Sequence, residues 1–204
     1  MALTLLHTAD IHRATFDTLR DRIAPNATLH HKVRPDWLAR AQNGIDASLE
    51  VEITAAVSAA SGSVLCTCTT LGPTAAKAGA MVIDAPMMQA AAERGGTILM
   101  AYCLPSTRAP SLAALEAAIA KSANFARAHP LLIGGAWPLF EAGNGTGFAI
   151  RIAEAITQEA AEITNLGSIV LAQASMLPAA PLLGGLGAPV LTSPELALRA
   201  ALNC

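Results

Sequence analysis

The stretch Val64-Leu65-Cys66-Thr67-Cys68-Thr69-Thr70-Leu71-Gly72 decides the fold class of this 204-residue chain. It begins as a short apolar strand, passes through a cysteine and two hydroxyl residues, and reaches a glycine before a helical pattern. In an open α/β sheet, ligands gather at the carboxyl ends of the strands. A thiol there can act as an acid, a base or a nucleophile, and neighbouring hydroxyl and N–H groups can hold an anion. The stretch therefore predicts an enzyme built on a parallel sheet.

Short apolar segments alternate with alanine-rich helical patterns along the whole chain, which is typical of βαβ units in a parallel sheet. We predict strands over residues 3–7, 29–33, 64–67, 81–83, 97–102, 131–133, 169–171 and 189–191. We predict helices over residues 14–23, from about 37, and over 47–59, 73–78, 86–93, 111–122 and 148–162. A last helix opens at Ser193-Pro194-Glu195, where serine suits the N-cap and proline the first turn.

The glycine pair Gly95-Gly96 divides this pattern into two halves. The order of elements restarts after it, so the two halves resemble two copies of one architecture. The span between Glu162 and Glu195 carries no charged residue, but its prolines and glycines argue against an even bilayer helix. It favours a buried strand, a helix, a loop and another strand.

Bulk composition limits the classes of function. Hydrophobic residues make up 53% of the chain, charged residues only 14%, and the formal net charge is -2. No basic stripe is present, which argues against a nucleic-acid partner. The low charge and high alanine content favour surface burial in a homo-oligomer, with a homodimer as the default. The first residues lack the basic lead and apolar core of a signal peptide, so we expect a cytoplasmic protein with no membrane association.

Four cysteines, Cys66, Cys68, Cys103 and Cys204, are too few and too irregular for a disulfide scaffold. Cys66 and Cys68 lie on one face of a strand and can bind metal as a pair, but no second cluster completes a site. We therefore predict no metal. Cys66 and Cys103 are interpreted as small buried hydrophobic residues. Cys68, at the strand end, is either a catalytic thiol or a buried cysteine.

Polar groups also follow the other predicted strands. Thr69 and Thr70 can hydrogen-bond a carboxylate, or a threonine can cap the helix that follows. Gln173 can hold a substrate or enolate oxygen, or it can hold a loop backbone. Thr8 follows the first strand and Thr107 the strand over 97–102, so we expect the polar groups of four strand ends to converge.

Several other motifs receive structural interpretations. We read Gly143-Asn144-Gly145-Thr146-Gly147 as a turn with a helix N-cap, because the lysine of a phosphate loop is missing. The glycines from Gly184 to Gly187 indicate a loop. We interpret His30-His31 as a solvated strand edge, and His12 and His129 have no partner visible in the sequence.

Two of these stretches resemble one family. Residues 65–72 resemble the first catalytic motif of the aspartate/glutamate/hydantoin racemase superfamily, in which Cys-Asn-Thr or Cys-Ser-Thr closes a strand. Residues 169–176 are similar to its second motif, normally Leu-Gly-Cys-Thr, and Thr107 sits where these enzymes carry a substrate-binding threonine. The resemblance implies α/β architecture with two pseudo-symmetric Rossmann-like lobes, each a parallel four-stranded sheet flanked by helices. The active site would lie in the cleft between them.

The resemblance further implies that the last helix returns to the first lobe. The first lobe then comprises residues 1–94 plus 193–204, and the second residues 95–192. It implies no cofactor. Two cysteines would face the α-carbon of a small carboxylate-containing substrate, and thiols suit this task because their pKa can be tuned. Hydroxyl and N–H groups would stabilise the developing charge.

This sequence departs from the family at the second motif. Gln173 stands where the second cysteine is expected, and glutamine is no acid or base at ordinary pH. We expect a cofactor-independent, racemase-like isomerase that uses Cys68 in proton transfer or nucleophilic chemistry at the α-carbon of a small carboxylate or amino acid. Alternatives are a one-thiol decarboxylase, lyase or cis-trans isomerase, a non-catalytic small-carboxylate binding protein, and a purely structural oligomer subunit. The predicted catalytic residues are Cys68 and Gln173, and the predicted substrate-binding residues are Thr8, Thr69, Thr70, Thr107 and Ser175.

Overall fold

A computed structural model describes residues 2–203, which form two compact α/β units. The first unit comprises the chain up to Pro86 together with the chain from Pro194 on, and the second comprises Met87–Ser193. Cys204 lies outside the described residues. Helix α5 (Ala85–Arg94) therefore lies mostly in the second unit, whereas the sequence placed it in the first. Its end is tied there by the Ser122 hydroxyl, which donates to the carbonyl of Ala92 at 3.1 Å.

The first unit contains a fully parallel four-stranded sheet in the order β2-β1-β3-β4. Its strands are β1 (Ala2–His7), β2 (Thr28–Val33), β3 (Ser63–Cys66) and β4 (Met81–Val82). Its helices are α1 (Ile11–Ile23), α2 (Pro35–Ala41), α3 (Ala47–Ser58), α4 (Gly72–Lys77) and α9 (Ser193–Leu202). Every strand predicted for this half is present, with ends within one or two residues.

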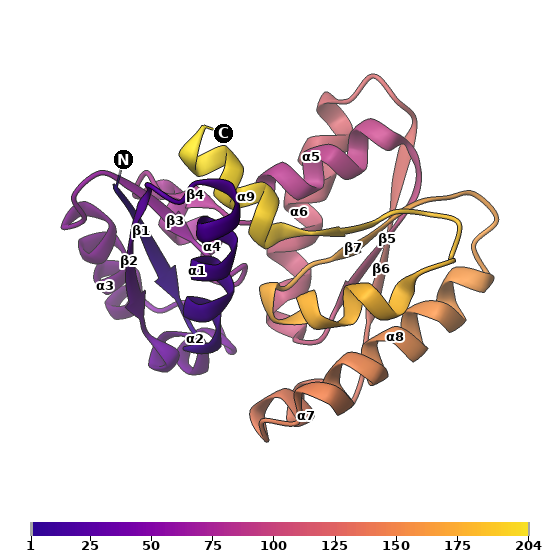
Figure 1. Ribbon diagram of the computed structural model, residues 1–204, viewed down its shortest axis with the longest axis horizontal. Helices are drawn as coiled ribbons and strands as arrows, with labels where there is room; N and C mark the ends of the chain where they lie inside the picture. Colours follow the sequence, from indigo (N-terminus) through magenta and orange to yellow (C-terminus); the bar gives the residue numbers. More distant parts are fainter. Residues whose placement is uncertain (1, 204) are drawn as a thin grey trace. The chain divides into compact units, whose positions relative to one another are not determined.

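Side-chain alternation along β1 and β3 gives this sheet two different faces. Leu6 and Cys66 pack on one face against Trp37 of α2 and Ile53 of α3. His7 points to the other face, where its ring lies 5.5 Å from that of Phe16 in α1. Figure 1 shows α1 and α3 on opposite sides of the sheet.

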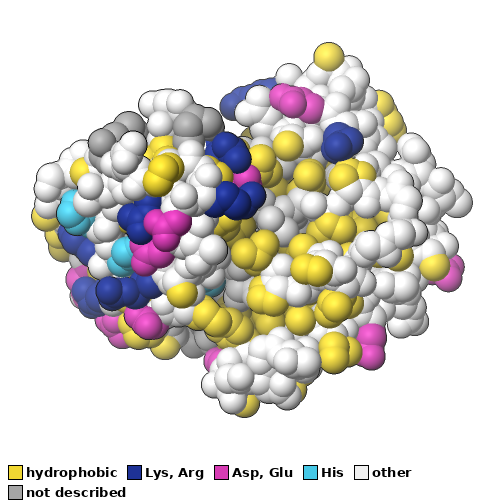
Figure 2. Space-filling model, in the orientation of Figure 1, with side chains coloured by type: hydrophobic (Ala, Val, Ile, Leu, Met, Phe, Trp, Pro, Cys, Tyr) yellow, Lys and Arg dark blue, Asp and Glu magenta, His cyan; other side chains and the backbone are white. Residues whose placement is uncertain are grey.

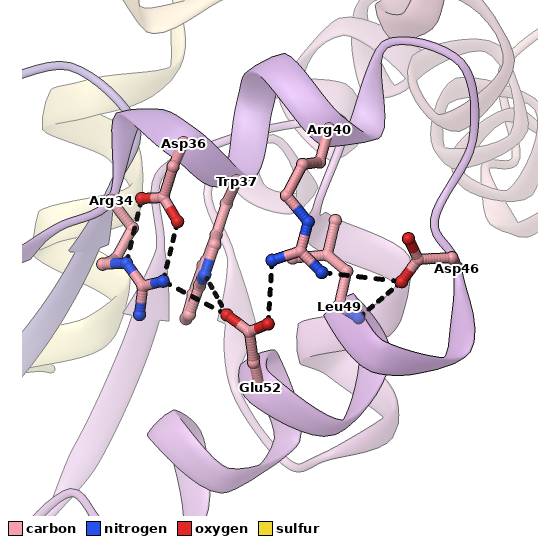
Figure 3. A network of polar contacts seen from close by, with 7 residues as sticks. All are labelled: Arg34, Asp36, Trp37, Arg40, Asp46, Leu49 and Glu52. Atoms are coloured by element: carbon pink, nitrogen blue, oxygen red, sulfur yellow. Dashed lines mark hydrogen bonds and ion pairs between the residues drawn. The ribbon is translucent and has the colours of Figure 1, made fainter.

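A polar network on Glu52 joins α2 to α3 (Figure 3). The Glu52 carboxylate accepts from the indole of Trp37 at 3.1 Å, from Arg40 at 2.8 Å and from Arg34 at 3.1 Å. The Arg34 guanidinium also lies 4.5 Å from the centre of the Trp37 ring. These donors lower the pKa of Glu52. The network satisfies the one polar atom of a tryptophan that is otherwise buried in the core, and no motif of the sequence predicted it.

The second unit repeats the same sheet, in the order β6-β5-β7-β8 and with all strands parallel. Its strands are β5 (Gly96–Tyr102), β6 (Ala126–Leu132), β7 (Leu166–Leu171) and β8 (Val190–Thr192). Its further helices are α6 (Pro105–Lys121), α7 (Trp137–Glu141), α8 (Gly145–Ala161) and the 3-10 helix η1 (Ala174–Leu183). The core joins β5 and β7 to α8 and η1 through Leu99, Ile169, Ile152 and Met176. In Figure 1, α8 runs on one side of this sheet and α6 on the other.

The structure corrects several details of the predicted elements in this half. Strand β6 begins five residues earlier than predicted because it is an edge strand, where a charged or proline residue such as Arg127 or Pro130 is tolerated. Helix α7 was not predicted. Ser193 begins α9, and its buried hydroxyl has no hydrogen-bond partner among the described residues, so the prediction that it caps the helix was wrong. Asn144 does cap α8, accepting from the N–H of Gly147 at 2.9 Å.

Charged side chains are unevenly distributed over the drawn face of the molecule. Figure 2 shows basic and acidic groups gathered over the first unit and many hydrophobic side chains over the second. Exposed large hydrophobic residues of the second unit include Phe125, Leu132, Ile150 and Leu182. The homo-oligomer remains a prediction. Within residues 2–203, no helix combines the length and the apolar character that a membrane crossing requires.

Three glycines allow backbone segments of the second unit to approach closely. Gly95 and Gly96 have φ of 74° and 72°, in the left-handed region that glycine favours. A Cβ on Gly167 of β7 would lie 1.9 Å from the carbonyl oxygen of Gly95 and 3.2 Å from the Cα of Gly96. The β5–β7 register shifts at this point, between Thr97 and Ile98. The glycine pair that divides the chain is therefore also a contact that needs glycine on both sides.

We expect Gly167→Ala to lower the free energy of unfolding by about 3 kcal/mol or more, because the methyl group overlaps backbone that cannot rotate away. Gly145→Ala is the matched control, since a Cβ there meets nothing within 4 Å. At this first position of α8 alanine should be neutral or stabilise by up to about 1 kcal/mol. Urea unfolding followed by circular dichroism measures both variants. Equal stability of the two would contradict the close-approach argument.

Candidate functional site

Three adjacent strands of the first unit end at the same edge of the sheet. The N–H of Thr67 donates to the carbonyl of Leu6 at 3.0 Å, and the N–H of Ile83 donates to that of Cys66 at 3.1 Å. These backbone hydrogen bonds continue the parallel pairing by one residue beyond the ends of the strands. They place Thr8, Cys68 and Asp84 at the carboxyl ends of β1, β3 and β4. Ligands of open α/β sheets bind at this edge.

The thiol of Cys68 is buried and surrounded by hydrogen-bond donors. Its side chain is 7% exposed and belongs to the apolar cluster that also contains Cys66 and Trp37. Burial raises the pKa of the Cys68 thiol above its ordinary value. The hydroxyl of Thr8 and the backbone N–H groups of Leu71 and Thr70 hydrogen-bond the sulfur and lower this pKa in opposition. The predicted pair Thr8 and Cys68 is thus in direct contact.

This arrangement can stabilise a negative charge that forms on the sulfur. Hydrogen bonds to the charged form of a group favour that form, whereas removal from water disfavours it. A thiol between these two influences can give up a proton to a reacting carbon and still be held as a thiolate. Cys66 differs, since its sulfur donates to the carbonyl of Cys68 at 3.5 Å and burial strongly raises the pKa of its thiol.

Thr69 and Thr70 form the turn that follows Cys68 and are both buried. The carbonyl of Thr69 accepts from the N–H of Gly72 at 3.1 Å, which closes the turn into α4. The N-cap residue of α4 is Leu71, not a threonine. The interpretation of a threonine as the helix cap is therefore wrong. The carboxylate-binding role of both hydroxyls stays a prediction.

Asp84 is a residue of this edge that the sequence analysis did not select. It follows β4, is 1% exposed, and neither carboxylate oxygen has a hydrogen-bond partner of good geometry among the described residues. Burial raises the pKa of Asp84 to about 7, and the nearby Thr69 hydroxyl opposes the shift. A carboxylate directly after the predicted strand 81–83 was the available signal.

A second feature missed from the sequence is a chain of polar side chains between the sheet and α1. His7 Nδ1 lies 2.7 Å from the Thr67 hydroxyl, and His7 Nε2 lies 2.8 Å from His31 Nδ1. His31 Nε2 lies 3.3 Å from an Asp17 oxygen. The Thr67 hydroxyl donates to the carbonyl of Leu6 at 2.9 Å, so it accepts from His7 Nδ1, and His7 Nε2 then accepts from His31 Nδ1. His31 is therefore no solvated edge residue, whereas His30 is exposed as predicted.

His12 lies beside this chain, with its ring 6.0 Å from that of His7. Burial lowers the pKa of His12 to about 4. Burial, followed by the charges of His12, His31 and Arg13, lowers the pKa of His7 to about 3. Both rings therefore remain neutral in the folded protein at ordinary pH. Thr67 points to this face, away from the side on which Cys68 packs.

The predicted residues of the second unit gather at the carboxyl edge of its own sheet. Gln173 follows β7, and its side-chain oxygen accepts from the N–H of Cys103 at 2.5 Å and of Leu104 at 3.2 Å. This matches the alternative in which Gln173 holds a loop backbone, here the one that leads from β5 into α6. Thr107 is buried in the first turn of α6. Ser175 is half-buried in η1.

Within the described range 2–203, no group of three or more histidine, cysteine, aspartate or glutamate side chains is placed to hold a metal ion. The buried groups at the edge of the first sheet include the thiols of Cys66 and Cys68, the carboxyl of Asp84 and the hydroxyls of Thr8, Thr69 and Thr70. What this edge offers is therefore acid–base or nucleophilic chemistry by a thiol, with hydroxyl and N–H donors beside it.

Comparison with known proteins identifies the fold. No protein-family model matches the chain, and no curated protein sequence matches it. Solved structures do match over the whole chain, and they share its two-sheet α/β fold. The fold expected from the sequence is therefore shown.

Three of the similar structures illustrate the match. Glutamate racemase from Francisella tularensis in complex with D-glutamate has a TM-score of 0.71 at 11% identity, over 99% of this chain and 80% of that one. Allantoin racemase from Klebsiella pneumoniae has a TM-score of 0.65 at 15% identity, over 100% and 86%. A liganded arylmalonate decarboxylase variant has a TM-score of 0.57 at 13% identity, over 99% and 91%. At these identities the likeness shows the fold alone.

The histidine pKa values predict how stability depends on pH. His7 and His12 are neutral in the folded state but take up protons in the unfolded state below about pH 6.5. The stability that comes from keeping these two rings neutral is fully present above that pH and is lost as the pH falls toward 4. Asp84 makes the free energy of unfolding rise as the pH falls from about 7 to 4. Over this range the folded state binds a proton at Asp84 that the unfolded state does not bind.

We therefore expect His12→Gln to flatten the acid side of the stability curve. Its free energy of unfolding should fall less steeply than that of the wild type below pH 6, by about 1.4 kcal/mol per pH unit. Urea unfolding at half-unit steps from pH 7 to 5 measures the two slopes. His30→Gln, at an exposed position, is the control and should reproduce the wild-type slope. Parallel slopes for wild type and His12→Gln would show that His12 is not held neutral by burial.

Proposed function

We propose that this chain is a cofactor-independent, racemase-like enzyme that acts at the α-carbon of a small carboxylate or amino acid through Cys68. The observation that carries the proposal is the environment of the Cys68 sulfur. A thiol at the carboxyl edge of a parallel sheet receives hydrogen bonds from Thr8, Thr70 and Leu71 while it is buried from solvent. Cys66, two residues away, has one backbone hydrogen bond of this kind, with Cys68, where Cys68 has three donors.

The proposed chemistry is a proton transfer between this sulfur and carbon. A carbanion or enolate forms next to the substrate carboxylate, and the thiol or thiolate exchanges a proton with it. The three donors stabilise the sulfur in its charged state. The hydroxyls of Thr69 and Thr70 lie in the turn beside the sulfur, where they can hold the carboxylate. The substrate-binding roles of Thr107 and Ser175 stay predictions, and the side-chain oxygen of Gln173 holds the backbone of Cys103 and Leu104.

Two kinds of reaction fit this site, and Gln173 bears on the choice. A racemase removes a proton from one side of a carbon and returns one to the other, which requires two acid–base groups. Gln173 supplies none, and its carbonyl oxygen is already bound to two backbone N–H groups. One-thiol chemistry, such as decarboxylation followed by protonation, needs only Cys68. The similar structures carry the names of both kinds of enzyme, racemase and decarboxylase.

A non-catalytic protein that binds small carboxylates is the second candidate. The observation that favours it is again Gln173, since an enzyme of the two-thiol kind would lose catalysis with this residue in place of a cysteine. The donors around Cys68 argue against it, because carboxylate binding alone does not require hydrogen bonds to a sulfur.

Turnover of a substrate panel in D2O tests the proposal. The panel contains both enantiomers of glutamate and aspartate, a hydantoin and an aryl-substituted malonate, with NMR detection of deuterium at the α-carbon. We expect one class to gain deuterium, or to lose CO2 and gain it, and we expect Cys68→Ser to slow this at least about 100-fold. Cys66→Ala, a change at the same strand end and depth, should retain most of the activity.

The outcomes separate the candidates. Racemisation gives both enantiomers with deuterium in the product, whereas decarboxylation gives a single deuterated product from the malonate. Tight binding of a panel member with no exchange over days would favour the binding protein. Unchanged turnover in Cys68→Ser would remove Cys68 from the mechanism.

A further inference from the structure

The side chain of Gln173 is oriented by two backbone hydrogen bonds. Its oxygen accepts from the N–H of Cys103 at 2.5 Å and from the N–H of Leu104 at 3.2 Å. Because both partners are donors, only the amide oxygen can occupy this place, and the NH2 group must lie at the other end of the amide. Gln173 therefore joins the end of β7 to Leu104, the N-cap residue of α6, and the fold fixes where its NH2 group lies.

This NH2 group keeps both of its N–H donors for a ligand. The hydrogen bonds of Gln173 within residues 2–203 are the two at its oxygen, and none is made by its nitrogen. Gln173 as a whole is only 8% exposed. Its nitrogen is not one of the fully enclosed polar atoms that lack a partner, so it reaches the surface at the carboxyl edge of the second sheet. A donor that is already largely removed from water gains more from an acceptor than an exposed donor does.

The first turn of α6 adds positive charge beside this amide. The aligned peptide dipoles of a helix leave a partial positive charge at its N-terminus, which favours an anion there. Helix α6 is 17 residues long, and its first turn contains no acidic residue. Arg108, in the same turn, is exposed and forms no ion pair with another residue of the described chain. A guanidinium at this end of a helix is unfavourable by itself, so an anion here would be attracted by both charges.

The chain segments around the amide carry no negative charge that would repel an anion. No charged residue occurs from residue 163 to residue 194, which includes β7, η1 and β8. The segment of residues 95–107, from β5 into α6, is also free of charged residues. Donors and positive charge therefore meet at this edge without a carboxylate of the same segments.

We infer that the carboxyl edge of the second sheet binds a carboxylate group of the substrate, which accepts from the NH2 group of Gln173 and is attracted by Arg108 and the N-terminus of α6. This inference rests on the proposed function and deepens it. Thr69 and Thr70 are proposed to hold one carboxylate, so a second carboxylate site favours substrates with two acidic groups over a neutral ring such as a hydantoin. Glutamine suits this task where a thiol does not, because an amide donates to an oxygen anion without exchanging a proton with it.

A role limited to holding the loop can be separated from ligand binding by one substitution. Gln173→Glu keeps an oxygen that accepts from Cys103 and Leu104, and it replaces the NH2 group by a second, negatively charged acceptor. The loop contact is therefore preserved and the ligand donor is lost. Gln173→Met, which removes both ends of the amide, is the second variant. Gln158→Glu makes the same chemical change at an exposed position of α8 and is the matched control.

The charge of Arg108 is tested by Arg108→Gln. Arg94→Gln is its control, since Arg94 is an exposed arginine of the same unit that lies in the last turn of α5. Urea unfolding of every variant confirms that each compared protein is folded.

The test is a titration of the full, 15N-labelled chain with malonate, with both enantiomers of glutamate and aspartate, and with hydantoin. NMR follows the side-chain NH2 signals of Gln173, which are assigned by their absence from the spectrum of Gln173→Glu. We expect a diacid to shift these signals to saturation and hydantoin to leave them in place. Affinity for that diacid should fall at least about tenfold in Gln173→Glu, because a donor becomes a like charge. It should fall about threefold in Arg108→Gln, because an exposed charge contributes less.

Gln158→Glu and Arg94→Gln should bind the diacid as the wild type does. Gln173 signals that stay unmoved by every diacid up to about 50 mM would overturn the inference. Wild-type affinity in folded Gln173→Glu would also overturn it and would leave Gln173 as a loop contact. Turnover through Cys68 is scored separately. A saturable shift without turnover leaves the carboxylate site standing and removes the enzyme, and turnover with unmoved Gln173 signals does the reverse.

Discussion

The candidate site depends on the parallel register of β1, β3 and β4 at their carboxyl ends. Two backbone hydrogen bonds, from Thr67 to Leu6 and from Ile83 to Cys66, extend this register beyond the strands. Because the three strands end at the same level, the hydroxyl of Thr8, the thiol of Cys68 and the carboxyl of Asp84 lie at one edge of the sheet. A change of one residue in the β3 register would turn Cys68 to the opposite face and place Thr67 among the apolar side chains of α2 and α3.

The alternation of side chains also separates two polar systems that are neighbours in sequence. Cys68 packs with the apolar cluster on one face, and Thr67 joins His7 and His31 on the other. Burial acts on both systems in the same direction, toward neutrality. It raises the pKa of thiols and of Asp84, and it lowers the pKa of His7 and His12. Burial therefore keeps the thiols and the two histidines uncharged at neutral pH.

The match to solved structures at 11 to 15% identity fits this picture, since what is shared is topology. The order 2-1-3-4 within each sheet requires only apolar strands, helices between them and glycine at close approaches. Gly95, Gly96 and Gly167 show how local this last demand is. The residues at the carboxyl edge of each sheet can change without loss of this topology, and Gln173 at the end of β7 is an example.

The sequence by itself determined the fold class, the two sheets and most element positions, because strand and helix periodicities are local properties of the chain. It also selected Cys68 and Thr8, because polar residues that directly follow apolar strands are visible without knowledge of their neighbours. It missed the first half of β6, since an edge strand is not continuously apolar, and it left the roles of Gln173 open.

Only the tertiary structure decided what those residues touch. The contact of Thr8 with Cys68, the bonds from Cys103 and Leu104 to Gln173, and the line from Thr67 through His7 to His31 all join residues far apart in the chain. Asp84 became a candidate residue of this edge only once its burial was known. A residue's proton affinity depends on its surroundings in three dimensions, and those surroundings are set by packing between segments that the sequence lists far apart.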